Sequence, residues 1–325
     1  MTTLYATLSP GARSEFINAQ GLKLATYAWP ATTQTRGAVL YLHGLATHAC
    51  FDLLSRPTLA YPGSFAEHLN SCGFALHSFD AQGHGASESF EGLRGHVRTI
   101  DDLLADALAV YEHVRATLPA ETPLYLAGES FGAGLGARLA ARLGRQLAGA
   151  FFVAPMLDLS TLKARPCARL TLCVLAVLER LAPSAQLIDV GASARAGAAA
   201  AGYPETNEYA FADPLVYKEK MRAGLIAGSL RLVDQMESCR AGVAAPILIV
   251  HSRRDTLTDW QGSARFAADC PSCELVLIDS SWHALLHEQP DNARVWRTIT
   301  NWLQKRAADA GCRVRLRLHE GEFRA

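Results

Sequence analysis

Residues 124–132 read Leu-Tyr-Leu-Ala-Gly-Glu-Ser-Phe-Gly, and this stretch decides the fold. A short apolar run is followed by Gly128-Glu129-Ser130-Phe131-Gly132 and then by a helical pattern over 131–143. Glycines two residues on either side of Ser130 allow a tight turn that exposes the serine hydroxyl above the end of a sheet. Five letters alone are a weak signal, and the alternative is a glycine-rich turn with an incidental serine. The strand–turn–helix context favours a nucleophilic serine.

The strand before Ser130 is one of six similar runs. Continuous apolar runs without alternation are typical of parallel strands that are covered on both faces. Helical patterns over 100–118, 131–143 and 290–304 lie between or after the runs, so the sequence predicts an α/β fold with a mostly parallel central sheet and helices on both faces. An antiparallel hairpin is expected over 14–29. The runs are residues 38–42, 74–79, 124–128, 149–154, 246–251 and 274–279.

The alternation of strands and helices stops between about 157 and 240. This block holds the apolar stretch 170–178, an Ala/Gly-rich stretch over 191–202 and a helical pattern over 213–239, with no strand expected. We therefore predict a core over 1–156 and 241–308, a helical cap inserted at 157–240, and a C-terminal extension over 309–325. For the extension, a solvated segment or an edge strand is favoured over a membrane-surface anchor.

Composition excludes several classes of protein. The chain has 325 residues, half of them hydrophobic, and its 31 basic residues balance 31 acidic ones. That is enough apolar surface for a large core, and the balanced charge argues against nucleic-acid binding. No apolar run reaches the length that a bilayer requires, and the start lacks the pattern of a secretory signal. The eight cysteines are expected to be reduced thiols in a cytoplasmic protein, with Cys270-Pro-Ser-Cys273 as a loop.

A serine hydroxyl needs a base, and the base needs an orienting acid. Asp255 follows the run 246–251, and His283 follows the run 274–279. Carboxyl ends of parallel strands meet at one edge of a sheet, so Ser130, Asp255 and His283 can converge there. The order Ser, acid, His is the order of hydrolases built on this type of turn.

Each position has rivals. Asp259 is expected to point outward from a helix, and Asp279 is too close to its strand and to His283. His287 lies four residues after His283, as in a zinc site, but the glutamate of H-E-x-x-H is missing. We therefore assign no metal. His251, at a strand end, is expected to be a packed or hydrogen-bonded core histidine.

Acyl transfer also needs two N–H donors aimed at the developing oxyanion. Phe131, directly after the serine, supplies one amide. The loop His43-Gly44-Leu45-Ala46 follows the first central strand, and Leu45 is the predicted second donor, with Ala46 next. His43 is expected to brace this loop and His84 to be structural.

At this point the chain resembles the monoacylglycerol lipase and lysophospholipase branch of the α/β-hydrolase superfamily. The resemblance covers residues 38 to 304 and rests on LHG (42–44), FDAQGHGASE (79–88), GESFG (128–132), VAP (153–155), ADPL (212–215), HSRRDTLTD (251–259) and SSWHALLHEQP (280–290). It implies Ser130 as nucleophile, Asp255 as acid, His283 as base, and the amides of Leu45 and Phe131 as the oxyanion hole. The chain departs from the family where HGLATHAC lacks an acidic residue and where Glu-Ser-Phe replaces His-Ser-Met.

The expected function is therefore hydrolysis of a lipid ester, a monoacylglycerol or a lysophospholipid, through an acyl-enzyme on Ser130, without a cofactor. A small-ester esterase, an acyltransferase, a peptidase, a lyase-type use of the same site and a non-catalytic receptor stay open. The stretch 170–178 either packs inside the cap or lines the entrance to Ser130 and touches a membrane surface. The sequence does not give the oligomeric state.

Overall fold

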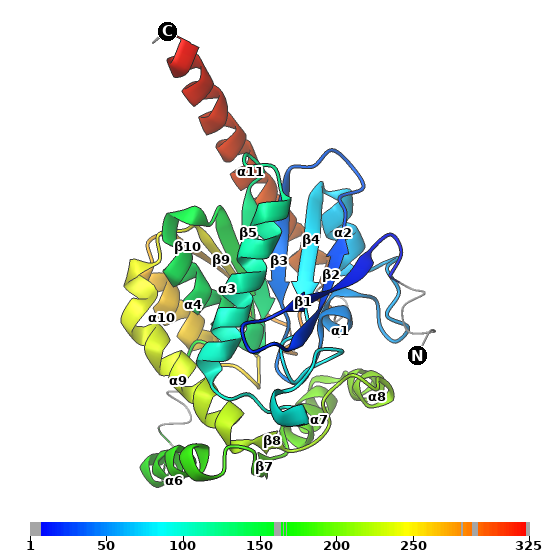
Figure 1. The fold of residues 1–325 in the computed structure, drawn as a ribbon, viewed down its shortest axis with the longest axis vertical. Helices are drawn as coiled ribbons and strands as arrows, with labels where there is room; N and C mark the ends of the chain where they lie inside the picture. Colours follow the sequence, from blue (N-terminus) through cyan, green and yellow to red (C-terminus); the bar gives the residue numbers. More distant parts are fainter. Residues whose placement is uncertain are drawn as a thin grey trace.

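The computed structural model describes residues 8–322 apart from 159–163, 165, 167, 281 and 288–291. Its central feature is an eight-stranded sheet in the order β1-β2-β4-β3-β5-β6-β9-β10 (Figure 1). In the described residues, the pairs β1–β2 and β2–β4 are antiparallel and the other five pairs of this sheet are parallel, so the sheet is mostly parallel as predicted. The strands are β1 (Ala12–Ile17), β2 (Lys23–Trp29), β3 (Gly37–Leu42), β4 (Phe74–Phe79), β5 (Leu124–Glu129), β6 (Gly149–Val153), β9 (Ile247–Ser252) and β10 (Cys273–Ile278).

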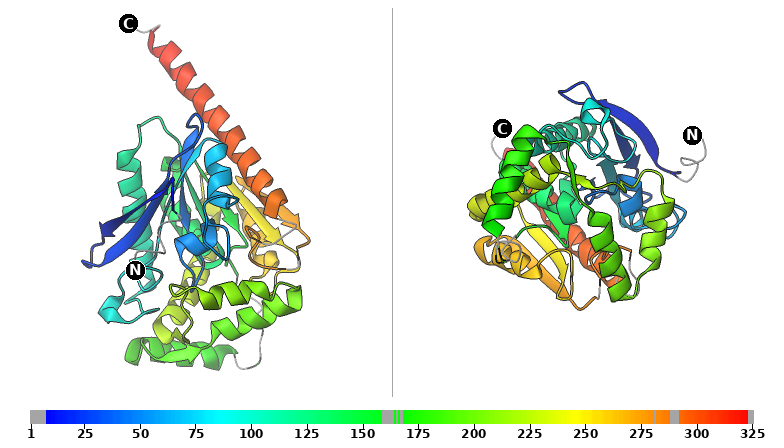
Figure 2. Two further views of the ribbon diagram at one scale, coloured as in Figure 1. Left: turned by 90° about the vertical axis from the view of Figure 1, so that its right-hand side faces the viewer. Right: turned by 90° about the horizontal axis from the view of Figure 1, so that it is seen from below.

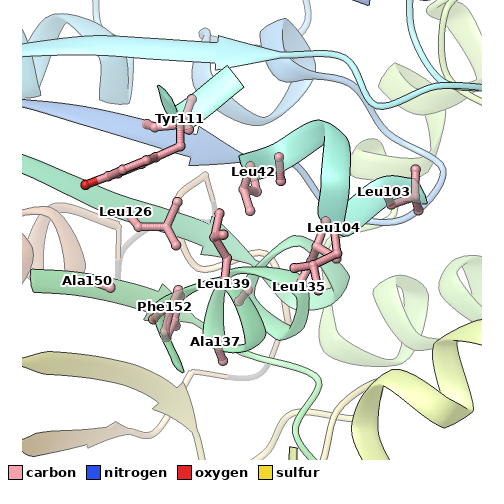
Figure 3. Packing of buried hydrophobic residues seen from close by; sticks show 14 of the residues in the cluster. Leu42, Leu103, Leu104, Tyr111, Leu126, Leu135, Ala137, Leu139, Ala150 and Phe152 are labelled. Atoms are coloured by element: carbon pink, nitrogen blue, oxygen red, sulfur yellow. The ribbon is translucent and has the colours of Figure 1, made fainter. Parts of the chain in front are cut away.

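The middle of the sheet is buried on both faces because its strands carry almost no polar side chains. Every residue of β3, β5 and β6 is buried. Side chains alternate between two apolar clusters. Leu126 and Phe152 face the helices α3 (Ile100–Thr117) and α4 (Ser130–Leu143), whereas Tyr125 and Phe151 face the opposite layer. Figure 3 shows the first cluster, in which Leu139 of α4 packs over Leu126 of β5. Helices on both faces therefore fix the strand ends that carry the site.

The helices of the core are α1 (Ala49–Leu53), α2 (Phe65–Ser71), α3 (Ile100–Thr117), α4 (Ser130–Leu143), α10 (Trp260–Asp269) and α11 (Asn292–Glu322), with 3₁₀ turns at Phe90–Gly92, Gly144–Gln146 and Arg240–Gly242. The hairpin expected over 14–29 is β1–β2. The six strand predictions are confirmed within one or two residues, and so are the helices predicted over 100–118 and 131–143.

The C-terminal helix differs from the expectation. The helix predicted over 290–304 continues as α11 to Glu322, so an edge strand in the C-terminal extension is wrong. Figure 2 shows the end of α11 projecting beyond the body of the molecule. Apolar residues such as Val295, Ile299 and Leu303 bury the first turns of this helix, and helical hydrogen bonding then continues into the basic segment.

The segment between β6 and β9 holds most of its structure as helices, at the end of the sheet opposite the projecting end of α11 (Figures 1 and 2). The Ala/Gly-rich stretch, for which no element was predicted, forms α7. The predicted helix over 213–239 begins only at Ala223, and a short antiparallel pair, β7–β8, was not expected. The domain boundaries stay a prediction. The elements are α6 (Ala168–Leu181), β7 (Gln186–Ile188), α7 (Val190–Ala201), α8 (Glu205–Ala212), β8 (Met221–Arg222) and α9 (Ala223–Cys239).

Candidate active site

Ser130 lies at the turn from β5 into α4 with a backbone φ of 54°, a conformation that non-glycine residues rarely adopt. The glycines beside it are required by close packing. A Cβ on Gly132 would lie 2.2 Å from the main-chain oxygen of Leu42, and one on Gly128 would lie 2.8 Å from the Ala133 nitrogen. The strained turn is therefore held between β3 and α4, and its serine faces the cavity beyond the strand ends.

Asp255 and His283 meet beyond the ends of β9 and β10. Nδ1 of His283 lies 2.6 Å from Oδ2 of Asp255, and both side chains are at least nine-tenths buried. The main-chain amides of Leu257 and Thr258 donate to Oδ1 of Asp255 at 2.8 and 3.0 Å. The carboxylate is thus fixed by its own loop and orients the imidazole, leaving Nε2 as the ring atom available for Ser130.

Two further residues hold this pair, and the sequence analysis assigned a site role to neither. The Thr258 hydroxyl lies 2.9 Å from Oδ2 of Asp255 and 3.1 Å from the main-chain oxygen of Ala154. His251 is fully buried, with Nδ1 2.7 Å from the Ser263 hydroxyl and Nε2 3.3 Å from Oδ2 of Asp255. The expectation of a hydrogen-bonded core histidine is confirmed, and the histidine also supports the acid.

The charges in this group stabilise one another. Burial alone would raise the pKa of Asp255, but the charge of His283 and hydrogen bonds from His251, His283 and Thr258 hold it well below its usual range. Burial alone would lower the pKa of His283, yet Asp255 raises it above 6.5, with smaller contributions from Glu129 and Asp52. The arrangement therefore favours an ionised acid beside an imidazole that accepts a proton readily.

The loop after β3 is held by its own polar groups. Nδ1 of His43 lies 2.7 Å from the Gly44 oxygen, while Nε2 of His43 accepts the Ala81 amide at 2.9 Å. The Thr47 hydroxyl also donates to the Gly44 oxygen, at 3.0 Å. In a trans peptide the C=O and N–H point in opposite directions, so fixing the Gly44 oxygen also fixes the direction of the Leu45 N–H. His43 braces this loop, as expected.

An acidic residue of the next helix contacts the first loop. Asp52 of α1 is buried, and its Oδ2 accepts the Gly44 amide at 2.7 Å. Arg56 lies 4.0 Å from the same carboxylate. Nε2 of His287 donates to the Asp52 main-chain oxygen at 2.7 Å, so this histidine holds helix α1, which follows the loop. Nothing in the sequence pairs Asp52 with Gly44, because the contact depends on the angle at which α1 leaves the loop.

The rival acids lie elsewhere. Asp259 caps α10, where its side chain accepts the Gln261 amide at 2.9 Å. Asp279 is exposed at the end of β10. His84 is structural as expected: it is buried, its ring packs against His43, and burial lowers its pKa to about 3.

Most of the predicted site residues line one cavity of about 490 Å³. Ser130, Phe131, Leu45 and His283 all line it, and Asp255 lies behind His283. Most of the wall is apolar, with contributions from Phe51, Met156, Phe211, Val216 and Trp282. This volume lies within the range of about 300–1,000 Å³ that is typical of small-molecule sites. Ser130, His283 and the backbone at Leu45 and Phe131 thus lie at one mostly apolar cavity.

The eight-stranded sheet and its serine turn define an α/β-hydrolase fold. Residues 33–290 match the family described as serine aminopeptidase, S33, and the chain belongs to that family. The predicted resemblance to the monoacylglycerol lipase-like branch is confirmed.

Relatives and solved structures agree with this assignment. The chain is 26% identical to a monoacylglycerol lipase of Mycolicibacterium smegmatis, over 90% of this chain and 97% of that protein. It is 25% identical to a monoglyceride lipase of Rattus norvegicus, over 91% of this chain and 92% of that protein. A soluble variant of the Saccharomyces cerevisiae monoglyceride lipase, solved with a substrate analogue, superposes with a TM-score of 0.71 at 20% identity, covering 91% and 94% of the two chains. The relatives support an ester-hydrolysing α/β-hydrolase.

Proposed function

We propose that this protein is a serine hydrolase that cleaves carboxylic esters of lipids, with a monoacylglycerol or a lysophospholipid as substrate. The observation that carries the proposal is the 2.6 Å contact between His283 and Asp255 at the wall of the cavity that Ser130 also lines. A serine that shares a cavity wall with an imidazole oriented by a buried carboxylate supports a nucleophile and its general base.

In the proposed reaction, the Ser130 Oγ–H proton passes to Nε2 of His283 as Oγ bonds to the ester carbonyl carbon. The carbonyl oxygen becomes an oxyanion held by the amides of Leu45 and Phe131. The carbon–oxygen bond to the alcohol then breaks, and His283 returns its proton to the departing alcohol. Water, deprotonated by His283, then attacks the acyl carbon. The bond from that carbon to Ser130 Oγ breaks, His283 returns the proton to Oγ, and the carboxylic acid is released.

The apolar cavity wall supports a lipid acyl chain as the bound group, since each buried methylene contributes about 0.8 kcal/mol. The outer face of α6 supports contact with a membrane surface. Leu170, Val174, Val177 and Leu181 are 65, 48, 54 and 79% exposed, and their spacing places them along one side of the helix. Helix α6 lies against α9, and the described residues that line the cavity include none from it. Helix α6 is thus neither packed wholly inside the cap nor part of the chamber entrance.

The part of the chain that the structure describes has no helix able to cross a membrane. Contact through α6 would therefore be peripheral, as expected of a short apolar stripe on an otherwise folded cap.

The test combines covalent labelling with a substrate panel. A fluorophosphonate probe should label the wild type and leave Ser130→Ala unlabelled. The panel should contain monoacylglycerols of short and long chain, a lysophospholipid, a short soluble ester, and glycerol as an acyl acceptor. Release of fatty acid from the lipid esters supports the proposal. Labelling with activity on the short ester alone would make the protein a small-ester esterase, ester synthesis would make it an acyltransferase, and absence of labelling would overturn the catalytic proposal.

A further inference from the structure

Residues 213–217, which we call the docking segment, connect the helical insertion to the loop that carries Leu45. The Tyr217 amide donates to the Ala46 main-chain oxygen at 2.8 Å. Nε2 of His48 lies 3.0 Å from Oδ2 of Asp213, and both side chains are almost completely buried. Two contacts thus run from a segment distant in the sequence to loop 43–48.

The hydrogen bond to Asp213 is the polar attachment of the His48 side chain. Within the described part of the chain, Nδ1 of His48 is buried without a hydrogen-bond partner, so the hydrogen bonding of the ring runs through Nε2, while the ring itself packs against Phe51. Asp213 is fixed independently, because its Oδ1 accepts the Leu215 amide at 2.8 Å. Asp213 is therefore the fixed member of the pair, and it sets the position of His48.

The contacts meet the loop where its backbone is strained. Ala46 has φ of 65°, in the left-handed region that costs energy for a residue with a side chain. Ala46 directly follows Leu45, whose amide is the proposed oxyanion donor. The core holds one side of that amide through His43, Thr47 and Asp52. The docking segment holds the other side, at Ala46 and His48, and so opposes relaxation of the strained turn.

From this geometry we propose that Asp213 and His48 are positioning residues for ester hydrolysis. Asp213 holds His48, and the pair keeps loop 43–48 in the conformation that presents the Leu45 amide to the oxyanion. This inference rests on the proposed function, because it acts on the transition state of the same reaction. The loss of the pair should lower kcat and leave KM nearly unchanged, since an oxyanion donor acts mainly on the transition state.

The docking segment has a further attachment, outside loop 43–48, that should keep the insertion in place when the pair is removed. Arg94 donates to the Leu215 oxygen and to the Gly85 oxygen, each at 2.7 Å, and thereby ties the segment to the loop after β4. Arg94 stays in place when the pair is removed. The insertion should then remain docked, and the change should be confined to loop 43–48.

The experiment measures kcat and KM for a short soluble ester with Asp213→Ala, His48→Ala and the double variant. Active enzyme is counted by fluorophosphonate titration, so a poorly folded fraction does not distort kcat. Each single variant should lose about 10- to 100-fold in kcat, somewhat less than removal of an oxyanion donor, with KM changed by less than about threefold. The double variant should be no worse than the singles, because both remove one interaction.

Two matched variants complete the test. His48→Gln keeps a side-chain N–H donor for Asp213 and should recover most of kcat. Glu219→Ala removes an exposed carboxylate of the insertion that pairs with Arg222 at 3.7 Å and does not touch loop 43–48, so kcat should stay at the wild-type level.

The results that would contradict the positioning role can be told apart. A raised KM with unchanged kcat would mean that the pair only shapes the pocket, and a lower melting temperature with unchanged kcat would mean that it only stabilises the fold. Additive losses in the double variant would also overturn the inference. If the wild type is neither labelled nor active on any ester, the proposed function itself fails. A labelled, active wild type with unaffected variants overturns only the positioning role.

Discussion

Oδ2 of Asp255 lies 2.6 Å from Nδ1 of His283, although 27 residues separate the two in the sequence. The contact arises because β9 and β10 are adjacent parallel strands, so the loops that follow them emerge side by side. A buried carboxylate in this position selects one imidazole tautomer and stabilises the protonated ring.

Replacing the proposed catalytic side chains should abolish ester hydrolysis without unfolding the protein. Ser130→Ala and His283→Ala should each lose about 10⁴-fold or more in kcat, and Asp255→Asn should also fall severely. Asp259→Asn and Asp279→Asn are the matched controls and should lose much less, since one caps α10 and the other is exposed. Near wild-type turnover in Asp255→Asn, with loss in Asp279→Asn, would reassign the acid.

Activity should not depend on a metal ion. The proposed steps use only a hydroxyl, an imidazole, a carboxylate and main-chain amides, so excess EDTA should leave the rate of ester hydrolysis unchanged. Added zinc should not raise the rate. Inactivation by the chelator, with recovery on zinc addition, would instead make His283 and His287 metal ligands.

The acidic limb of the pH profile should lie above pH 6.5. His283 must be neutral to accept the Ser130 proton, and its pKa is raised, so kcat/KM should fall as pH drops through that raised pKa. Glu129→Gln removes a negative charge that contributes to the shift and should move the limb to lower pH. An unmoved limb in Glu129→Gln would show that Glu129 does not contribute to the raised pKa of His283.

The exposed stripe on α6 should govern binding to lipid surfaces. Val174→Glu should weaken sedimentation with phospholipid vesicles and raise KM for long-chain monoacylglycerol in them, with kcat for a short soluble ester unchanged. Leu178→Glu, on a half-buried position, should act in the same direction with some loss of stability. The matched control is Ile17→Glu, an exposed apolar site on β1. Equal vesicle binding by Val174→Glu and the wild type would remove α6 as a contact surface.

Two glycine substitutions should show where a glycine is required by close packing and where it is not. Gly132→Ala places a methyl group against the Leu42 oxygen, so it should cost about 1–3 kcal/mol or more in unfolding free energy. Gly242→Ala meets no atom within 4 Å and should be neutral or slightly stabilising. Denaturant titration measures both. An unaltered midpoint for Gly132→Ala would mean that the serine turn can shift away from β3.

The sheet could be predicted from sequence because burial on both faces leaves strands such as 124–128 and 149–153 with no polar positions. The order of Ser130, Asp255 and His283 could be predicted because each follows a strand. The secondary structure of the helical insertion is harder to predict from sequence. Alanines and glycines of 191–201 carry little hydrophobic pattern, although alanine favours helices strongly. The start of α9 was misplaced because 213–222 has helical spacing but instead contacts loop 43–48.

Side chains that hold other residues of the site in place escaped prediction for another reason. Thr258 and Asp52 are ordinary polar residues in sequence, and their function depends on partners in other elements. A single sequence contains no signal for such contacts. The positive φ of Ala46 is equally invisible in the sequence, because alanine gives no signal for a left-handed backbone.

Strands β6 and β9 pair directly, with Ala150 opposite Ile247 and Val153 opposite Val250. The whole helical insertion therefore leaves and re-enters the sheet at neighbouring points. A change in the length of this insertion therefore need not alter the register of the strands that precede Ser130, Asp255 and His283. An exchanged insertion should leave these proposed catalytic residues in place, and by our proposal it would also need an equivalent of Asp213 to meet His48.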